Sequence, residues 1–277
     1  MLIPFDVAKT DRSTRTHVRT RRRSIGYVLA ALVAFCVVCA TAEARDLPDT
    51  IAAVKPSIVG VGTMEDTRSP PAAFRGTGFA VGNGHYVATN AHVIPQVLDD
   101  SKHEYLAVFI GSGNHPDIRK AERIAADYDH DLAILKISGA ALPPMVLGDS
   151  TGVREGERVA FTGFPIGSVL GLFPATHRGL IAAITPIAVP MDTSKGLDPR
   201  MIAQLRAPFS VFQLDATAYP GNSGSPLFRP DSGEVIAVVN MAFVKDSREK
   251  VLSEPSGITY AMPAKFIKVL LDRVRAP

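Results

Sequence analysis

The strongest constraint on the fold is a succession of short apolar runs separated by Gly, Pro, Asn and Asp. The runs cover residues 57–61, 78–81, 85–89, 105–110 and 132–137, and then 158–162, 179–184, 211–214, 235–239 and 257–261. Strands of this length at regular spacing are typical of an all-β barrel or sandwich, whereas a parallel sheet would alternate them with long helices. The sequence therefore predicts an all-β fold.

Helices are expected only at the edges of this β-rich region. Residues 47–54 precede Pro56 and favour a short helix before the first run. At the other end, residues 263–275 carry apolar side chains at 266, 267, 270, 271 and 274, which is one face of a helix. Residues 138–149 lie between the two sets of runs and are predicted to be a linker.

The first 44 residues have the pattern of an export signal. A basic stretch is followed by the apolar segment 25–42 and by two Ala-x-Ala sequences that end at Ala42 and Ala44. This order is typical of a cleaved secretory signal peptide. The apolar segment also has about the minimum length for crossing a bilayer, so an uncleaved anchor stays open. We expect a periplasmic or secreted protein, membrane-anchored only if residues 25–42 are retained.

Charge argues against a nucleic-acid partner. Of the 30 basic residues, seven lie in residues 1–44, together with three of the 27 acidic ones. The remainder holds 23 basic and 24 acidic residues, a net charge of −1. A nucleic-acid-binding domain needs a basic face, and this composition does not supply one.

No cofactor, metal site or disulfide is expected in the exported part. Cys36 and Cys39 are the two cysteines of the chain and lie inside the apolar leader segment. The histidines outside the leader, apart from His92, show no paired ligand spacing; they are His85, His103, His115, His130 and His177. Stability should therefore rest on packing and hydrogen bonds.

Three segments carry the residue types of a catalytic triad, in the order His, Asp, Ser. They are Ala88–Ile94 with His92, Asp129–Leu135 with Asp131, and Gly221–Leu227 with Ser223. A serine hydroxyl becomes an effective nucleophile only when a base removes its proton, which is the role predicted for His92. Asp131 would orient the imidazole and stabilise its charged form. This order excludes an α/β-hydrolase, in which the serine comes first.

The glycines beside Ser223 predict an oxyanion hole. We expect backbone N–H groups of Gly221, Asn222 and Ser223 to point at the oxygen that becomes negative during acyl transfer. Small residues in this turn keep the approach to those groups open.

Longer stretches around these motifs resemble trypsin-like serine proteases of the HtrA (Deg) type. The matching stretches include Gly76-Thr-Gly-Phe, Thr89-Asn-Ala-His-Val, Gly163-Phe-Pro-Ile-Gly, Gly221-Asn-Ser-Gly-Ser-Pro and Tyr260-Ala-Met-Pro, and the similarity covers about residues 46–275. The resemblance implies two six-stranded β-barrels, at about 55–140 and 150–262, with the active site between them and the helix 263–275 after them. It also implies misfolded or exposed envelope polypeptides as substrates. Such proteins are often trimers, and a homo-oligomer stays open.

The chain departs from the family pattern in two places. It stops after the terminal helix, where HtrA proteins usually continue into PDZ domains, so regulation by such a domain is not expected in cis. The stretch 185–212 is longer than its counterpart and is interpreted as an insertion, with an active-site loop or a subunit contact as alternatives.

Asn222 bears on activation. In digestive relatives an Asp at this position pairs with a new N-terminus, and an amide cannot form that ion pair. We therefore expect no proteolytic activation. A requirement to trim the mature N-terminus before activity appears would contradict this.

The pocket for the substrate side chain is predicted from position alone. One wall is expected from Thr217 and Ala218, and the other from Asn240, Met241 and Ala242. Since Thr217 stands where a Lys- or Arg-specific protease has an acid, small to medium apolar side chains are expected. The main alternative function is a protease-fold binding or chaperone-like protein with little turnover.

Overall fold

The computed structural model describes residues 45–113, 115–167, 171–186, 209–240 and 258–275. Residues 45–277 cluster as one compact unit. The predicted leader lies outside the described residues, as does most of the 185–212 stretch.

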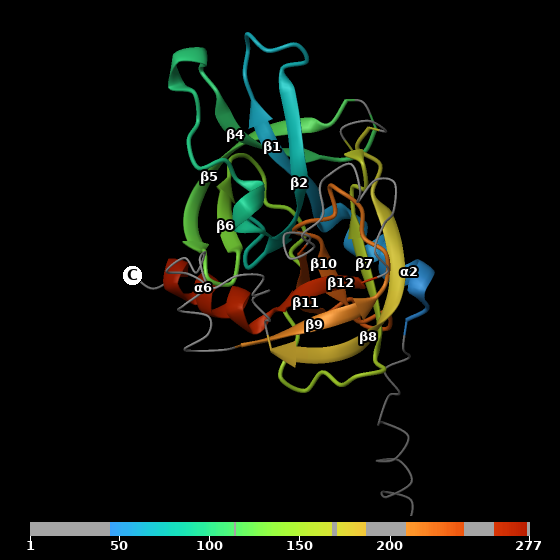
Figure 1. Cartoon of the computed structure of the whole chain (residues 1–277). Helices are drawn as coiled ribbons and strands as arrows, with labels where there is room; N and C mark the ends of the chain where they lie inside the picture. The colour runs from blue at the N-terminus through green and yellow to red at the C-terminus, as the bar shows by residue number, and fades with distance from the viewer. Residues whose placement is uncertain (1–44, 114, 168–170, 187–208, 241–257, 276–277) are drawn as a thin grey trace, which may run out of the picture. The chain divides into compact units, whose positions relative to one another are not determined.

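The first half of this unit is a closed six-stranded barrel, seen in the upper half of Figure 1. Its strands are β1 (Ile58–Met64), β2 (Ala72–Val81), β3 (Tyr86–Thr89), β4 (Tyr105–Ile110), β5 (Asp117–Asp127) and β6 (Leu132–Ile137). They follow the order β1-β2-β3-β6-β5-β4 around the barrel, and every pairing named between them is antiparallel.

The second half forms another closed barrel, in the lower half of Figure 1. Its strands are β7 (Arg158–Gly163), β8 (Ala175–Pro186), β9 (Ser210–Asp215), β10 (Pro226–Phe228), β11 (Val235–Asn240) and β12 (Ile258–Pro263). Their order around the barrel is β10-β11-β12-β9-β8-β7. The predicted fold of two six-stranded β-barrels is confirmed.

Two strands have no counterpart among the predicted apolar runs. β5 carries charges along most of its length, and Ala121 is its one buried residue. It is held as a strand by pairing with β4 on one side and β6 on the other, so tertiary context overrides its own pattern. β10 is fully buried but has only three residues, too few for a hydrophobic period to show.

Both predicted helices are present. α2 spans Leu47–Val54, and the carboxylate of Asp46 caps its N-terminus by accepting from the Leu47 N–H. α6 spans Lys265–Arg275 and buries Ile267, Leu270 and Leu271. It lies against β5 and β6 of the first barrel, although it follows β12 of the second (Figure 1). No helix in the described part of the chain is both long and apolar enough to span a bilayer.

A shared apolar core joins the two barrels. One cluster of buried side chains includes Phe79 and Phe109 of the first barrel, Phe164 and Phe228 of the second, and Leu270 of α6. Because the cluster is continuous, neither barrel can shift without breaking close-packed contacts. The side chains at the barrel interface are therefore held in a fixed frame.

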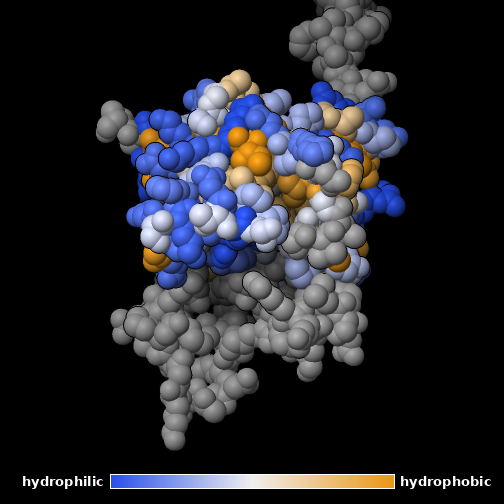
Figure 2. Space-filling model, turned by 90° about the horizontal axis from the view of Figure 1, so that it is seen from above, coloured by the Kyte–Doolittle hydropathy of each residue, from blue (hydrophilic) through white to orange (hydrophobic). Residues whose placement is uncertain are grey.

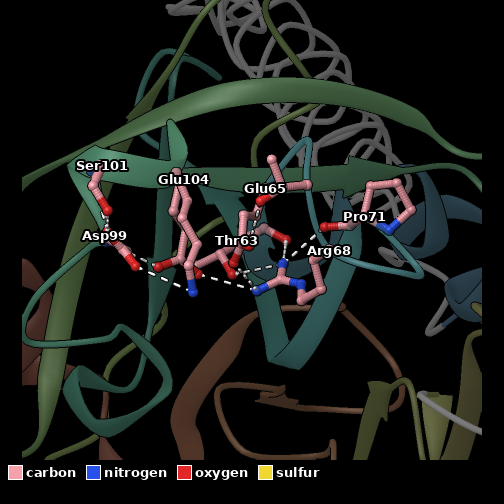
Figure 3. A network of polar contacts seen from close by, with 9 residues as sticks. Thr63, Glu65, Arg68, Pro71, Asp99, Ser101 and Glu104 are labelled. Atoms are coloured by element: carbon pink, nitrogen blue, oxygen red, sulfur yellow. Dashed lines mark hydrogen bonds and ion pairs between the residues drawn. The ribbon is translucent and has the colours of Figure 1, made fainter.

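The far end of the first barrel is polar. Figure 2 looks onto this end and shows a mainly hydrophilic surface with small hydrophobic areas. In the loop of the β1–β2 hairpin, the guanidinium of Arg68 contacts carboxylates of Glu65 and Glu104 at 3.5 and 3.2 Å and donates to Thr63 O at 3.1 Å (Figure 3). Neutralised charges of this kind fix the hairpin against the β4 side of the barrel.

Candidate active site

His92 and Asp131 meet at one end of the first barrel. His92 lies on a short 3₁₀ helix, Ala91–Val93, directly after β3, and Asp131 immediately precedes β6, which pairs with β3. The Nδ1 atom of His92 lies 2.5 Å from Asp131 Oδ2, and the His92 backbone N–H donates to Asp131 Oδ1 at 2.9 Å. With Nδ1–H donating to the carboxylate, the Nε2 atom of a neutral His92 is left as the proton acceptor.

Asp131 is buried and fully supplied with partners. The residue is 5% exposed and has a positive φ of 53°, an unusual backbone conformation for a residue other than glycine. Its backbone carbonyl accepts from the Asn90 side chain at 3.0 Å, which holds this turn. A further donor reaches the carboxylate from the second barrel, where Asn240 Nδ2 lies 2.8 Å from Oδ2. A buried carboxylate with several donors is fixed in position and cannot turn away from the imidazole.

Asn240 thus has a contact that the sequence did not indicate. It lies at the end of β11, and its amide nitrogen is directed at Asp131, 109 residues away in the chain; its place in a pocket wall stays a prediction. No local pattern signals such a pairing. Only the register of β11 brings the amide to the carboxylate.

Ser223 lies in a turn of the second barrel just before β10. Gly221 and Gly224 on either side have φ values of +101° and +89°. A side chain at Gly221 would overlap the carbonyl oxygen of Phe164, and one at Gly224 would overlap that of Thr77. These two glycines are required both by their backbone conformation and by the space around them.

The backbone N–H groups of this turn differ in availability. Asn222 N–H donates to Tyr219 O at 2.9 Å, so this predicted oxyanion donor is engaged within the turn. Among the described residues, nothing accepts from the N–H of Gly221 or of Ser223. The preceding carbonyl of Pro220 accepts from Ile166 N–H at 2.7 Å. Because a trans peptide points its C=O and N–H in opposite directions, the Gly221 N–H faces away from Ile166.

The side chains next to the nucleophile are buried without partners. Within the described part of the chain, neither polar atom of the Asn222 amide has a hydrogen-bond partner, and the same holds for Ser225 Oγ. Asn222 is fully buried. The prediction that proteolytic activation is not needed stays a prediction.

The remaining predicted residues fall as follows. Thr217 is partly exposed and Ala218 is buried, and the Ala218 N–H donates to Thr259 Oγ1 at 3.2 Å. Met241 and Ala242 lie outside the described residues. In the structure as described, Ser223 Oγ makes no hydrogen bond to the His92 ring; such bonds are often loose without substrate. No group of three His, Cys, Asp or Glu side chains is gathered around a common point among the described residues.

A two-barrel fold with a His–Asp pair on one barrel and a serine in a glycine turn on the other defines the trypsin-like class. Residues 76–238 match the family described as the trypsin-like peptidase domain, which is more than half of the chain. The chain therefore belongs to this family.

Several known proteins are similar over most of this chain. A probable periplasmic serine endoprotease, DegP-like, from Halomonas elongata is 32% identical over 200 residues, which cover 72% of this chain and 35% of the relative. The mitochondrial serine protease HTRA2 of Drosophila pseudoobscura pseudoobscura is 31% identical over 240 residues, covering 83% of this chain and 48% of that protein. The chain thus spans about a third to a half of the length of these relatives.

The fold has a solved counterpart. The crystal structure of the Rv3671c protease from M. tuberculosis, in its active form, aligns with a TM-score of 0.60. The alignment covers 82% of this chain and 85% of that one at 23% sequence identity. This likeness supports the two-barrel fold and nothing beyond it.

Proposed function

We propose that this protein is a serine endopeptidase in which His92, Asp131 and Ser223 form the catalytic triad. The observation that carries the proposal is the His92–Asp131 pair, with Nδ1 and Oδ2 2.5 Å apart, together with a serine whose turn leaves two backbone N–H groups without partners in the described part of the chain. A base, its orienting carboxylate and a pair of free donors are the groups that acyl transfer requires.

In the proposed reaction, Ser223 is the nucleophile and His92 carries its proton. Ser223 Oγ attacks the carbonyl carbon of the peptide bond while its proton passes to His92 Nε2. The resulting oxyanion is bound by the N–H groups of Gly221 and Ser223. His92 then gives the proton to the leaving amine, the C–N bond breaks, and an acyl-serine remains. Water then attacks the acyl carbon while His92 takes its proton, and the proton passes to Ser223 Oγ as the ester bond breaks and the acid is released. Asp131 stabilises the charged imidazole in both halves of the reaction.

The proposed place of action is the cell envelope. Its support is the leader pattern of residues 1–44 and the printed description of the Halomonas relative as a probable periplasmic serine endoprotease. We propose misfolded or exposed polypeptides as substrates, cleaved after small to medium apolar side chains, because Thr217 brings no acid to the expected pocket. Assembly into a homo-oligomer belongs to the same proposal.

Casein digestion tests the activity. The purified protein should cleave unfolded casein, and Ser223→Ala should reduce the rate by at least about 10⁴-fold. Ser225→Ala is the matched control, because it removes a hydroxyl of the same turn that has no hydrogen-bond partner among the described residues. Its activity should stay near that of the wild type. Equal rates for Ser223→Ala and the wild type would refute the triad.

The binding-protein alternative has its own outcome in this experiment. A folded wild type that retains casein on a column without cleaving it would favour a chaperone-like function. If the wild type does cleave casein, a peptide library with different residues before the cleaved bond tests the proposed specificity. Cleavage after Lys or Arg would contradict the apolar pocket.

A further inference from the structure

Among the described residues, Thr77 is the residue of the first barrel that bonds the backbone around the nucleophile. Thr77 lies on β2 of the first barrel and is fully buried. Its backbone N–H donates to Ser223 O at 2.8 Å. Its hydroxyl donates to Gly221 O at 2.7 Å, across 144 residues of sequence. One residue thus bonds the carbonyl groups on both sides of Asn222.

The Thr77 hydroxyl has a defined direction. Phe164 N–H donates to Thr77 Oγ1 at 3.1 Å, and a hydroxyl has one proton to give. With Phe164 N–H on one side, that proton is directed at Gly221 O. There is also little free space beside the hydroxyl, because a Cβ at Gly163 would come 2.9 Å from Thr77 Oγ1. The hydroxyl therefore links two hydrogen bonds, one from Phe164 just after β7 and one to Gly221 in the nucleophile turn.

These hydrogen bonds restrain the backbone beside the N–H groups of Gly221 and Ser223, which have no partner among the described residues. Gly221 has φ +101° and no side chain, so its backbone can rotate through conformations that other residues cannot reach. The peptide before Gly221 is fixed by Ile166, as described above. The peptide after it is held at its oxygen by Thr77 Oγ1 and at its nitrogen by Tyr219 O, 2.9 Å from Asn222 N. Without the hydroxyl, one of these restraints on Gly221 is lost.

We propose that the Thr77 hydroxyl is a positioning group that aligns the Gly221 and Ser223 N–H groups toward the oxyanion. The inference rests on the proposed function. It assigns to the first barrel a share in oxyanion stabilisation, in addition to the His–Asp pair. Since the oxyanion forms only during reaction, losing the hydroxyl should lower kcat and leave KM nearly unchanged.

Two substitutions at Thr77 isolate the hydroxyl. Thr77→Val keeps the shape and removes the hydroxyl, and Thr77→Ser keeps the hydroxyl and removes the methyl group. We expect T77V to lower kcat about 10- to 100-fold, less than the loss of a whole oxyanion donor, and T77S to stay within about threefold of the wild type. If T77V does not fold, Thr77→Cys replaces it, because a thiol is only a weak donor.

Thr162→Val is the matched control. Thr162 is also fully buried in the second barrel, and its hydroxyl is paired with that of Thr176 of β8 at 2.9 Å rather than with the backbone of the nucleophile turn. It should lose stability to a similar extent as T77V and keep the wild-type kcat. A kcat that falls equally in T162V and T77V would mean that only general destabilisation is being measured, and would overturn the inference.

A peptide boronic acid gives a readout that turnover does not provide. Ser223 Oγ adds to the boron, and the tetrahedral adduct places an oxygen where the oxyanion would be. Expressed as the full chain, T77V should bind the boronic acid about 10- to 100-fold more weakly than the wild type, whereas affinity for a product peptide should not change. Equal boronate affinity in both proteins, or no measurable binding by either, would overturn the role of Thr77. Failure of the wild type to cleave casein, in contrast, would contradict the proposed function.

Discussion

The two halves of the candidate site are built in different ways. In the first barrel, both oxygens of the Asp131 carboxylate have donors, and the His92 ring is held by one of them. In the second barrel, the turn at Ser223 leaves two N–H groups unpaired and buries the Asn222 amide and the Ser225 hydroxyl without partners among the described residues. The first half is held by hydrogen bonds to one carboxylate, including a bond from Asn240 of the second barrel, and the second half by glycine conformation and by bonds from Thr77 of the first barrel.

This difference predicts which substitutions act mainly on catalysis and which also act on folding stability. A carboxylate with strong partners can lose its charge while the backbone around it stays in place, so changes in the His–Asp pair should act mainly on catalysis. A turn that depends on positive-φ glycines tolerates no side chain at them, so changes at these glycines should affect folding and catalysis together. The following variants test that contrast, beginning with the largest expected effect.

Asp131→Asn should reduce kcat about 10⁴-fold, with a loss of folding stability of about 1–3 kcal/mol because the amide nitrogen faces a donor that the carboxylate accepted. The amide keeps the shape of the carboxylate, but it no longer favours the Nδ1–H form of His92 or stabilises the imidazolium. Steady-state kinetics and urea unfolding on the same preparation measure both quantities. A variant that unfolds before it loses activity would remove the proposed difference between the two halves.

Gly224→Ala should reduce both folding stability and activity, with a free-energy loss of about 3 kcal/mol or more. An alanine there would have to keep the unfavourable φ of +89°, and its methyl group would overlap the Thr77 carbonyl oxygen. Gly156→Ala is the matched control, because Gly156 has φ +84° and no atom within 4 Å of the added carbon. It should lose only about 1–2 kcal/mol, the strain of the conformation alone. Equal losses in urea unfolding would show that the contact with Thr77 has no effect.

Asn240→Leu should lower kcat about 10- to 100-fold and stability by about 1–3 kcal/mol. The substitution removes the donor at 2.8 Å from Asp131 Oδ2 and leaves a buried charge with one partner fewer. This variant sharpens the comparison, since the affected carboxylate is in one barrel and the lost donor in the other. Unchanged kcat would mean that His92 alone is sufficient to orient Asp131.

Arg68→Ala should lower stability by about 1–3 kcal/mol without changing kcat/KM. The guanidinium holds Glu65, Glu104 and Thr63 at the far end of the first barrel (Figure 3). Lys102→Ala is the control for an exposed ion pair, here with Asp99 at 3.4 Å, and should have almost no effect. A loss of activity in the Arg68 variant would show that the hairpin is coupled to the site.

The smallest effect concerns pH. Burial lowers the pKa of His177 below its usual 6.5, with the ring stacked on Phe161 at 4.9 Å. The unfolded chain then takes up a proton at a higher pH than the folded one, so stability is lost as pH falls from above 6.5 through the folded pKa. His177→Phe should therefore show a smaller fall in Tm than the wild type between about pH 7.5 and 5.5. A parallel fall in both proteins would contradict this assignment.

The sequence determined more of the strands than of the contacts between them. Short apolar runs predicted ten of the strands because strands such as β4, β7 and β11 are buried on both faces, which leaves a continuous apolar run in the sequence. The charged β5 and the three-residue β10 left no such signal, since their neighbours in the barrel hold them in place. The candidate triad could be named from its motifs because a base, an acid and a nucleophile need particular side chains.

What the tertiary structure alone decided is how the two barrels support each other. The bonds from Asn240 to Asp131 and from Thr77 to Gly221 join residues 109 and 144 positions apart. Both Asn and Thr are common residues, and hydrogen bonding sets their role only once a partner is within about 3 Å. The sequence by itself thus determined which groups the site contains, and the packing of the barrels through their shared core decided which of them touch.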